Sequence, residues 1–109
     1  MNQFHGHGIL KEPKGMYDGE FKNGKKHGKG IFQYRNGLIY EGEYQDGIRQ
    51  GKGALYNTSN EGMTKRLAYE GNFENGMPHG KGEILNDQNI RESTQWVNGV
   101  AMELIADNI

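Results

Sequence analysis

The fold is decided by the stretch Tyr17-Asp18-Gly19-Glu20-Phe21-Lys22-Asn23-Gly24-Lys25-Lys26-His27-Gly28-Lys29-Gly30, because the chain repeats it. Its first five residues have the form Tyr-x-Gly-x-aromatic, which returns at residues 40–44 and 69–73, and a Gly-Lys-Gly step follows each copy. A repeat of this length indicates an array of stacked units rather than one irregular core. The second aromatic recurs after 23, 29 and 23 residues, at Phe21, Tyr44, Phe73 and Trp96.

The spacing divides the chain into a single array that covers residues 1–109. The longer middle interval places an insertion of six residues between Tyr56 and Tyr69. A variable segment of this kind is expected to form a longer hairpin that can contact a partner. The expected parts are a partial unit at 4–16, full units at 17–39, 40–68 and 69–91, and a degenerate last unit at 92–109.

Composition alone resembles that of a disordered chain, with 33% hydrophobic residues and a mean hydropathy of −0.94. The net charge is only −1 and the aromatics are regularly spaced, so we expect an ordered fold. A near-neutral chain has no general attraction to nucleic acid. The sequence contains no cysteine, and its first residues do not resemble a secretion signal. These features favour a cytoplasmic location.

Alternation predicts two short strands in each unit. Tyr17, Gly19 and Phe21 fall on one side of the first strand, and Gly28, Gly30, Phe32 and Tyr34 are expected to share a side of the second. Asn-Gly and Asp-Gly pairs supply the tight turns between strands. The prediction is an all-β protein, a single-layer twisted antiparallel meander. Its glycines leave room for aromatic rings to lie across neighbouring strands.

These residues resemble the MORN repeat (membrane occupation and recognition nexus), whose pattern is Tyr-Glu-Gly-Glu-aromatic, an Asn-Gly turn and then His-Gly-Lys-Gly. The resemblance implies an elongated half-pipe of β-hairpins that serves as a binding platform, as in junctional, ciliary and cytoskeletal proteins. The chain departs from the pattern at Gln50, where the family has histidine, and at residues 100–105, where the glycines are lost. We expect the latter segment to cap the array, either as a last strand or as a short helix, and the preserved turn before it favours the strand.

The leading functional hypothesis is a scaffold that binds a protein partner, within a cytoskeletal or ciliary (flagellar) assembly as the resemblance implies. A single-layer sheet has no second layer, so its aromatic side is expected to be an exposed apolar groove. A partner helix or extended segment would lie along that groove. The expected contact residues are Tyr17, Phe21, Phe32, Tyr34, Tyr40, Tyr44, Leu55, Tyr69, Phe73 and Trp96.

An alternative hypothesis is a peripheral membrane module that binds anionic phospholipid, because four lysines cluster around the first turn. Another possible route to assembly is the edge strand expected near residues 6–10, which could pair with a second chain. The lysines of the alternative lipid site are Lys22, Lys25, Lys26 and Lys29.

No catalytic residue, metal site, cofactor or small-molecule substrate is expected. His5, His27 and His79 occupy equivalent positions two strands apart, about 9–10 Å from one another, which is too far for neighbours to share an ion. We expect them to bond backbone groups in the turns or to pack on rings. The acidic side chains recur on the side opposite the rings, where cross-strand pairs with Lys22, Lys29, Lys52 and Lys81 are expected.

Overall fold

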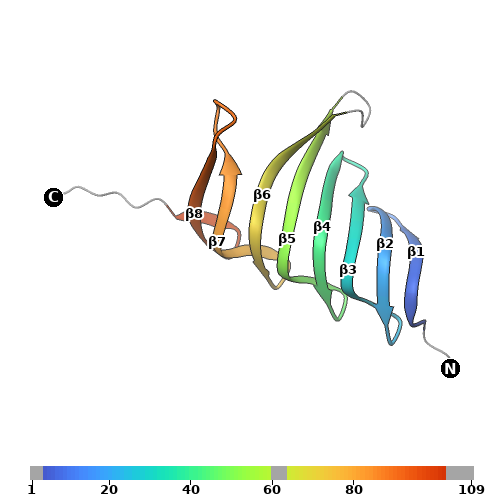
Figure 1. The fold of residues 1–109 in the computed structure, drawn as a ribbon. Coiled ribbons are helices and arrows are strands. Elements are labelled where there is room, and N and C mark those ends of the chain that lie inside the picture. Colours follow the sequence, from blue (N-terminus) through green and yellow to red (C-terminus); the bar gives the residue numbers. More distant parts are fainter. Residues whose placement is uncertain (1–3, 60–63, 103–109) are drawn as a thin grey trace.

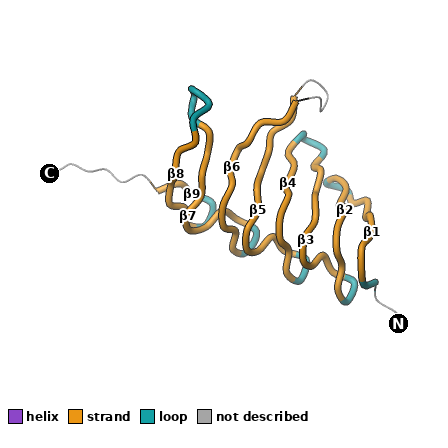
Figure 2. The backbone as a smooth tube through the Cα atoms, viewed as in Figure 1, coloured by secondary structure: helices purple, strands orange, loops and turns teal. Residues whose placement is uncertain are grey.

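The computed structural model describes residues 4–59 and 64–102, which form one antiparallel sheet with its strands in sequence order (Figure 1). The array is elongated, with extents of 61 × 31 × 19 Å. Within the described residues the backbone consists of strands and short connections and contains no helix (Figure 2). The predicted all-β meander is therefore confirmed. The strands are β1 (Gly6–Glu12), β2 (Gly15–Lys22), β3 (Lys25–Tyr34), β4 (Leu38–Gln45), β5 (Ile48–Ser59), β6 (Thr64–Glu74), β7 (Met77–Leu85), β8 (Arg91–Val97) and β9 (Val100–Met102).

Four tight turns join strands where the sequence predicts them. At Asn23-Gly24 both residues have positive φ, 52° and 76°, as type I′ hairpin turns require. The turns at residues 46–47, 75–76 and 98–99 have the same geometry. Asp or Asn tolerates the first position and glycine the second, which explains why these pairs recur.

The rings of one face form a continuous chain of edge-to-face contacts. Successive ring centroids lie 5.0–5.3 Å apart, and the ring planes cross at 74–88°. This geometry is favourable for aromatic pairs, at about 0.5–1.5 kcal/mol each beyond the area buried. It links every unit to the next. The order is Phe4, Phe21, Tyr17, Tyr44, Tyr40, Phe73, Tyr69 and Trp96.

Glycine makes room for these rings, as predicted. A Cβ atom added at Gly30 would lie 2.4 Å from the Tyr17 ring, far inside the normal contact distance. Gly53 has the same relation to Tyr40. The tyrosine hydroxyl then passes over the glycine and donates a hydrogen bond to a backbone carbonyl. For Tyr17 the acceptor is the carbonyl oxygen of Glu20, 2.8 Å from the hydroxyl.

One prediction about the second strand is wrong. Gly28 does not share a face with Gly30, since a Cβ atom at Gly28 would meet the Glu20 carboxylate 3.0 Å away on the opposite side of the sheet. The cause is a bulge in β3 at Gly28, whose φ is +72°. A bulge adds residues to one strand and resets the alternation of faces. Equivalent register shifts occur in the β4–β5 and β6–β7 pairs.

Successive turns are joined to one another through the histidine position of the motif. The Nδ1 atom of His79 accepts a hydrogen bond from the backbone N–H of Asn98 at 3.3 Å, and His5 accepts one from Asn23 in the same way. Gln50 departs from the motif, yet its Oε1 atom accepts the N–H of Asn75 at 3.0 Å. The expected bond from a turn histidine to the backbone is confirmed at His5 and His79.

The insertion and the two ends also follow the sequence. β5 and β6 form the longest hairpin, paired as far as Ser59 and Thr64, while its tip at 60–63 lies outside the described residues. β9 is a strand over Val100–Met102, as expected, and the remainder of the predicted cap lies outside the described residues. Among the strands that the structure describes, β1 pairs only with β2, and pairing of its other edge with a second chain stays a prediction.

Candidate functional site

The expectation that the ten aromatic-face residues are exposed is wrong. Six of them form the buried core, and the other four pack against it and are partly buried. None lines a groove of about 1150 Å³ on the opposite face of the sheet. Their role as direct partner contacts is untested, and burial argues against it. The buried residues are Tyr17, Phe32, Tyr40, Tyr44, Tyr69 and Phe73, and the partly buried ones are Phe21, Tyr34, Leu55 and Trp96.

Cationic side chains from the turns help to cover the rings, and this explains the error. The Nζ atom of Lys26 lies 5.3 Å from the centre of the Phe32 ring. The Arg49 guanidinium lies 5.4 Å from the Tyr40 ring and 5.3 Å from the Phe73 ring. A cation over a ring face is attracted to it, and its aliphatic stem covers apolar surface. The aromatic face therefore serves as the core of the protein.

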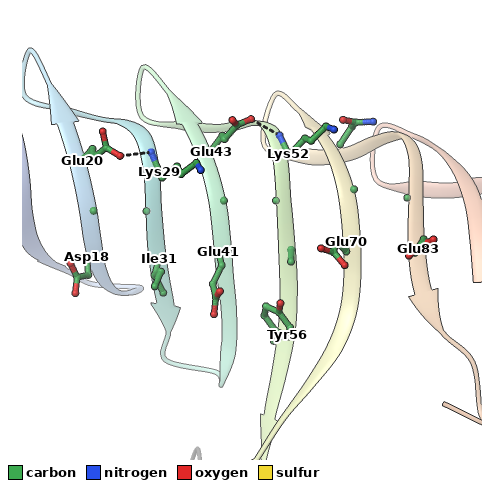
Figure 3. A pocket seen from close by; sticks show the side chains of 18 of the residues that line it. Asp18, Glu20, Lys29, Ile31, Glu41, Glu43, Lys52, Tyr56, Glu70 and Glu83 are labelled. Atoms are coloured by element: carbon green, nitrogen blue, oxygen red, sulfur yellow. Dashed lines mark hydrogen bonds between the residues drawn. The ribbon is translucent and has the colours of Figure 1, made fainter. Parts of the chain in front are cut away.

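This groove of about 1150 Å³, on the face opposite the rings, runs across β1 to β8. We call it the carboxylate groove. Six carboxylates line it against three lysines, and Figure 3 shows several of these side chains projecting from neighbouring strands. Its charged lining residues are Asp18, Glu20, Glu41, Glu43, Glu70, Glu83, Lys29, Lys52 and Lys81.

One row of the carboxylate groove mixes apolar and acidic side chains. Ile31 pairs with Asp18 on one side and with Glu41 on the other, so an isoleucine lies between two carboxylates. It remains 40% exposed. Ala54 occupies the same position one unit further, and it pairs with Glu41 and Glu70. An exposed apolar residue within a charged groove is a suitable anchor point for a partner side chain.

Two glutamates in a second row bond to the backbone at the bulges. The sequence predicts lysine side chains as their partners, and this prediction is wrong for both. Glu20 accepts the backbone N–H of Lys29 at 3.2 Å, and Glu43 accepts that of Lys52 at 2.7 Å. The bulge turns these N–H groups toward the groove, where a carboxylate can reach them. The third unit has Asn72 in this position, and its amide donates to the Lys81 carbonyl at 3.4 Å.

The carboxylates of the first row form ion pairs with cations that lie outside the Gly-Lys-Gly steps. Lys65, in the β5–β6 hairpin, lies 3.0 Å from Glu41, and its Nζ atom is also 4.3 Å from the centre of the Tyr56 ring. At the other end, Arg91 bridges Glu70 at 2.6 Å and Glu83 at 2.9 Å. These pairs are exposed, so each contributes little to stability. A partner cation can therefore replace them at low cost.

The four lysines of the lipid hypothesis do not form one patch. Lys26 lies over the rings, with its side chain only 15% exposed and 2.7 Å from Glu12. Lys29 lines the carboxylate groove on the other face. Lys22 and Lys25 are exposed and pair across the turn. The predicted cluster is thus divided between two faces.

Within residues 4–59 and 64–102, no group of three or more potential ligands is arranged to hold a metal ion. His7, which also lines the carboxylate groove, pairs with Asp18 at 2.6 Å. In the same part of the chain, no helix is long and apolar enough to cross a membrane.

Sequence reasoning missed Ile31 and Tyr56 as residues of the groove. A signal was present, because Ile31 lies between Gly30 and Phe32 and alternation places it on the charged face. An apolar side chain at an outward position of a strand indicates a contact surface. Tyr56 carried the same signal, because it follows Leu55 and alternation along β5 places it on the charged face.

Comparison with known protein families supports the repeat. The MORN repeat model matches four segments, residues 1–16, 17–39, 40–59 and 69–85, which together make up most of the chain. No curated protein gives a significant match. The motif, the hairpin array and these matches agree, and the chain belongs to the MORN repeat family.

Proposed function

We propose that this protein is a scaffold that binds a segment of a partner protein in the carboxylate groove. MORN repeats are commonly binding or scaffold modules and are generally non-catalytic. The observation that carries the proposal is the groove itself, which crosses β1 to β8 on the face that the core leaves free. This assignment moves the partner site from the aromatic face to the opposite one.

The lining of the groove indicates the chemistry of the partner. Ile31 offers an apolar contact, and Glu41, Glu70 and Glu83 offer carboxylates already held by weak, exposed ion pairs. Equivalent positions lie two strands apart, a repeat of about 9.5 Å. An extended or helical segment that presents basic and apolar side chains at this interval would match the row. Membership of a cytoskeletal or ciliary assembly is inferred from the family resemblance alone.

The membrane alternative has less support, because Lys26 and Lys29 lie on different faces. Attraction to anionic lipid requires about 4–8 basic residues clustered near the surface. No observation specifically favours it. It is tested beside the main proposal with vesicles that contain phosphoinositide.

The test compares two groove variants with one control. Ile31→Thr keeps a β-branched residue in the strand but removes the apolar anchor, and Glu41→Gln removes a carboxylate without changing size. Lys25→Gln, at an exposed position where β3 begins, is the control. Tagged proteins are used to capture partners from the native cell, followed by mass spectrometry and then affinity measurement with the purified partner.

We expect both groove variants to weaken the partner's affinity about 3- to 10-fold and the control to leave it unchanged. If the partner binds the wild-type protein and both groove variants with equal affinity, the binding site lies elsewhere. Capture by vesicles in physiological salt that is weakened several-fold in Lys25→Gln but not in the groove variants would replace the proposal with the membrane alternative.

A further inference from the structure

A second cavity, of about 450 Å³, lies on the aromatic side of the sheet, beside the β4–β5 turn. Its size is within the range of sites that hold small molecules. The lining includes three aromatic side chains, Phe32, Tyr34 and Tyr44, and residues 47–49 at the end of the turn and the start of β5. We call it the ring-side pocket. It is separate from the carboxylate groove, with which it shares no lining residue.

Tyr44 is the unusual residue of this pocket. Its position in the repeat is occupied by Phe21, Phe73 and Trp96 in the other units. The Tyr44 side chain is 5% exposed, and its hydroxyl has no hydrogen-bond partner among the described residues. By contrast, the buried hydroxyls of Tyr17, Tyr40 and Tyr69 each donate to a backbone carbonyl. A buried hydroxyl without a partner requires an explanation, and an unfilled ligand site provides one.

The charge around the pocket is positive. Lys14, Lys26 and Arg49 line it, against the single carboxylate of Glu12. The positions of Lys26 and Arg49 are equivalent, because the backbone carbonyl of each accepts the N–H of a glycine in the following turn. Phe4 and Pro78 have the same role in the flanking units. Two neighbouring cations at this position therefore occur only around Tyr44 in the described array.

We propose that the ring-side pocket binds a small organic anion, with an aromatic or apolar body that carries a carboxylate or a phosphate monoester. The body would pack against Phe32 and Tyr34. The anionic group would lie between Lys26 and Arg49 and accept a hydrogen bond from the Tyr44 hydroxyl once flexible side chains at the rim move aside. A charge-assisted bond of this kind is stronger than a neutral one.

The experiment is a ¹H–¹⁵N NMR titration of the full chain with phenyl phosphate and, separately, with benzoate. Inorganic phosphate and phenol are the controls for the charge alone and the ring alone. We expect saturable shifts centred on the amides of residues 47–49. Affinity for one or both organic anions should exceed that for inorganic phosphate by about tenfold. The two arms distinguish a phosphate ligand from a carboxylate.

Tyr44→Phe is the decisive variant, because the same position holds phenylalanine in two other units and the substitution should preserve the fold. We expect it to weaken binding at least about tenfold. Lys14→Gln changes an exposed residue of the rim and should weaken binding without disturbing the core. Lys52→Gln, in the carboxylate groove, should leave the affinity unchanged.

The proposal is overturned if neither organic anion gives saturable shifts, or if inorganic phosphate binds as tightly as phenyl phosphate. It is also overturned if folded Tyr44→Phe binds like the wild-type protein. None of these results bears on partner binding in the carboxylate groove.

Discussion

At the scale of single residues, the fit between glycine and tyrosine determines the core. Gly53 would place a Cβ atom 2.5 Å from the Tyr40 hydroxyl and 2.6 Å from its ring. The ring cannot retreat, because it also contacts Tyr44 and Phe73 edge to face. A methyl group at this position must therefore displace the ring or the strand.

We predict that Gly53→Ala lowers the free energy of unfolding by about 1–3 kcal/mol, because overpacking forces the ring out of position. The neighbouring Lys52 side chain projects into solvent, so Lys52→Ala should change the free energy of unfolding by less than about 0.5 kcal/mol. Urea unfolding followed by far-UV circular dichroism measures both. If the two variants unfold at the same urea concentration, the ring does not require the glycine.

The same residues show how much of the core could be predicted from the sequence. Tyr17, Gly19 and Phe21 were placed on one face correctly, because alternation holds along an unbroken strand. Gly28 was placed on the wrong face, because a bulge with positive φ changes the alternation and glycine does not indicate a bulge by itself. The burial of the rings was missed because Lys26 and Arg49 cover them. Charged residues beside a turn are typical of a solvated surface, so the sequence does not indicate this cover.

At the scale of elements, each hairpin is attached to the next at both its strands and its turn. The N–H of Gly76 donates to the carbonyl of Arg49 at 3.0 Å, beside the bond between Asn75 and Gln50. The next turn repeats this arrangement with Gly99 and Pro78. Histidine and glutamine both serve because each offers an acceptor at a similar reach from the backbone.

We predict that His79→Gln preserves stability within about 0.5 kcal/mol, while His79→Ala lowers it by about 1 kcal/mol, the usual loss for one hydrogen bond. The Asn98 N–H is exposed enough to find water, which limits the loss. Thermal and urea unfolding of the three proteins would measure the difference. Equal destabilisation by glutamine and alanine would mean that another contact of His79, such as its Nε2 atom 3.3 Å from Glu74, stabilises the turn in place of the Nδ1 acceptor.

At the scale of the whole molecule, the array behaves as a one-dimensional stack, because each strand of the described residues pairs only with its sequence neighbours. Such a stack depends on the contact between units, and here that contact is the chain of rings. The order of strands was predictable from the repeat, since consecutive hairpins of one motif have one way to stack. The location of the carboxylate groove was not, because it depends on which face the core occupies.

The ring chain also makes the stability of the whole array sensitive to alkaline pH. Burial raises the pKa of Tyr17 from 10.0 to about 12, and burial likewise raises the pKa of Tyr40, Tyr44 and Tyr69 above its usual value. Between pH 10 and the folded pKa values, the unfolded chain loses tyrosine protons that the folded protein retains. The contribution of these tyrosines to the free energy of unfolding is therefore fully present below about pH 10, and it decreases as the pH rises above that value.

We predict that the urea midpoint declines steeply from about pH 10, the ordinary pKa of tyrosine, to about pH 12, the pKa of Tyr17 in the folded protein. Each of the four tyrosines contributes up to about 1.4 kcal/mol per pH unit in this window. Tyr17→Phe removes one of these groups while keeping its ring, so its stability should decline less steeply with pH, although it loses a hydrogen bond at neutral pH. Urea unfolding at closely spaced pH values, followed by circular dichroism, gives both slopes. Because lysine titration is common to both proteins, identical slopes would show that Tyr17 ionises in the folded array as freely as in the unfolded chain, and that the rings are not sealed from water.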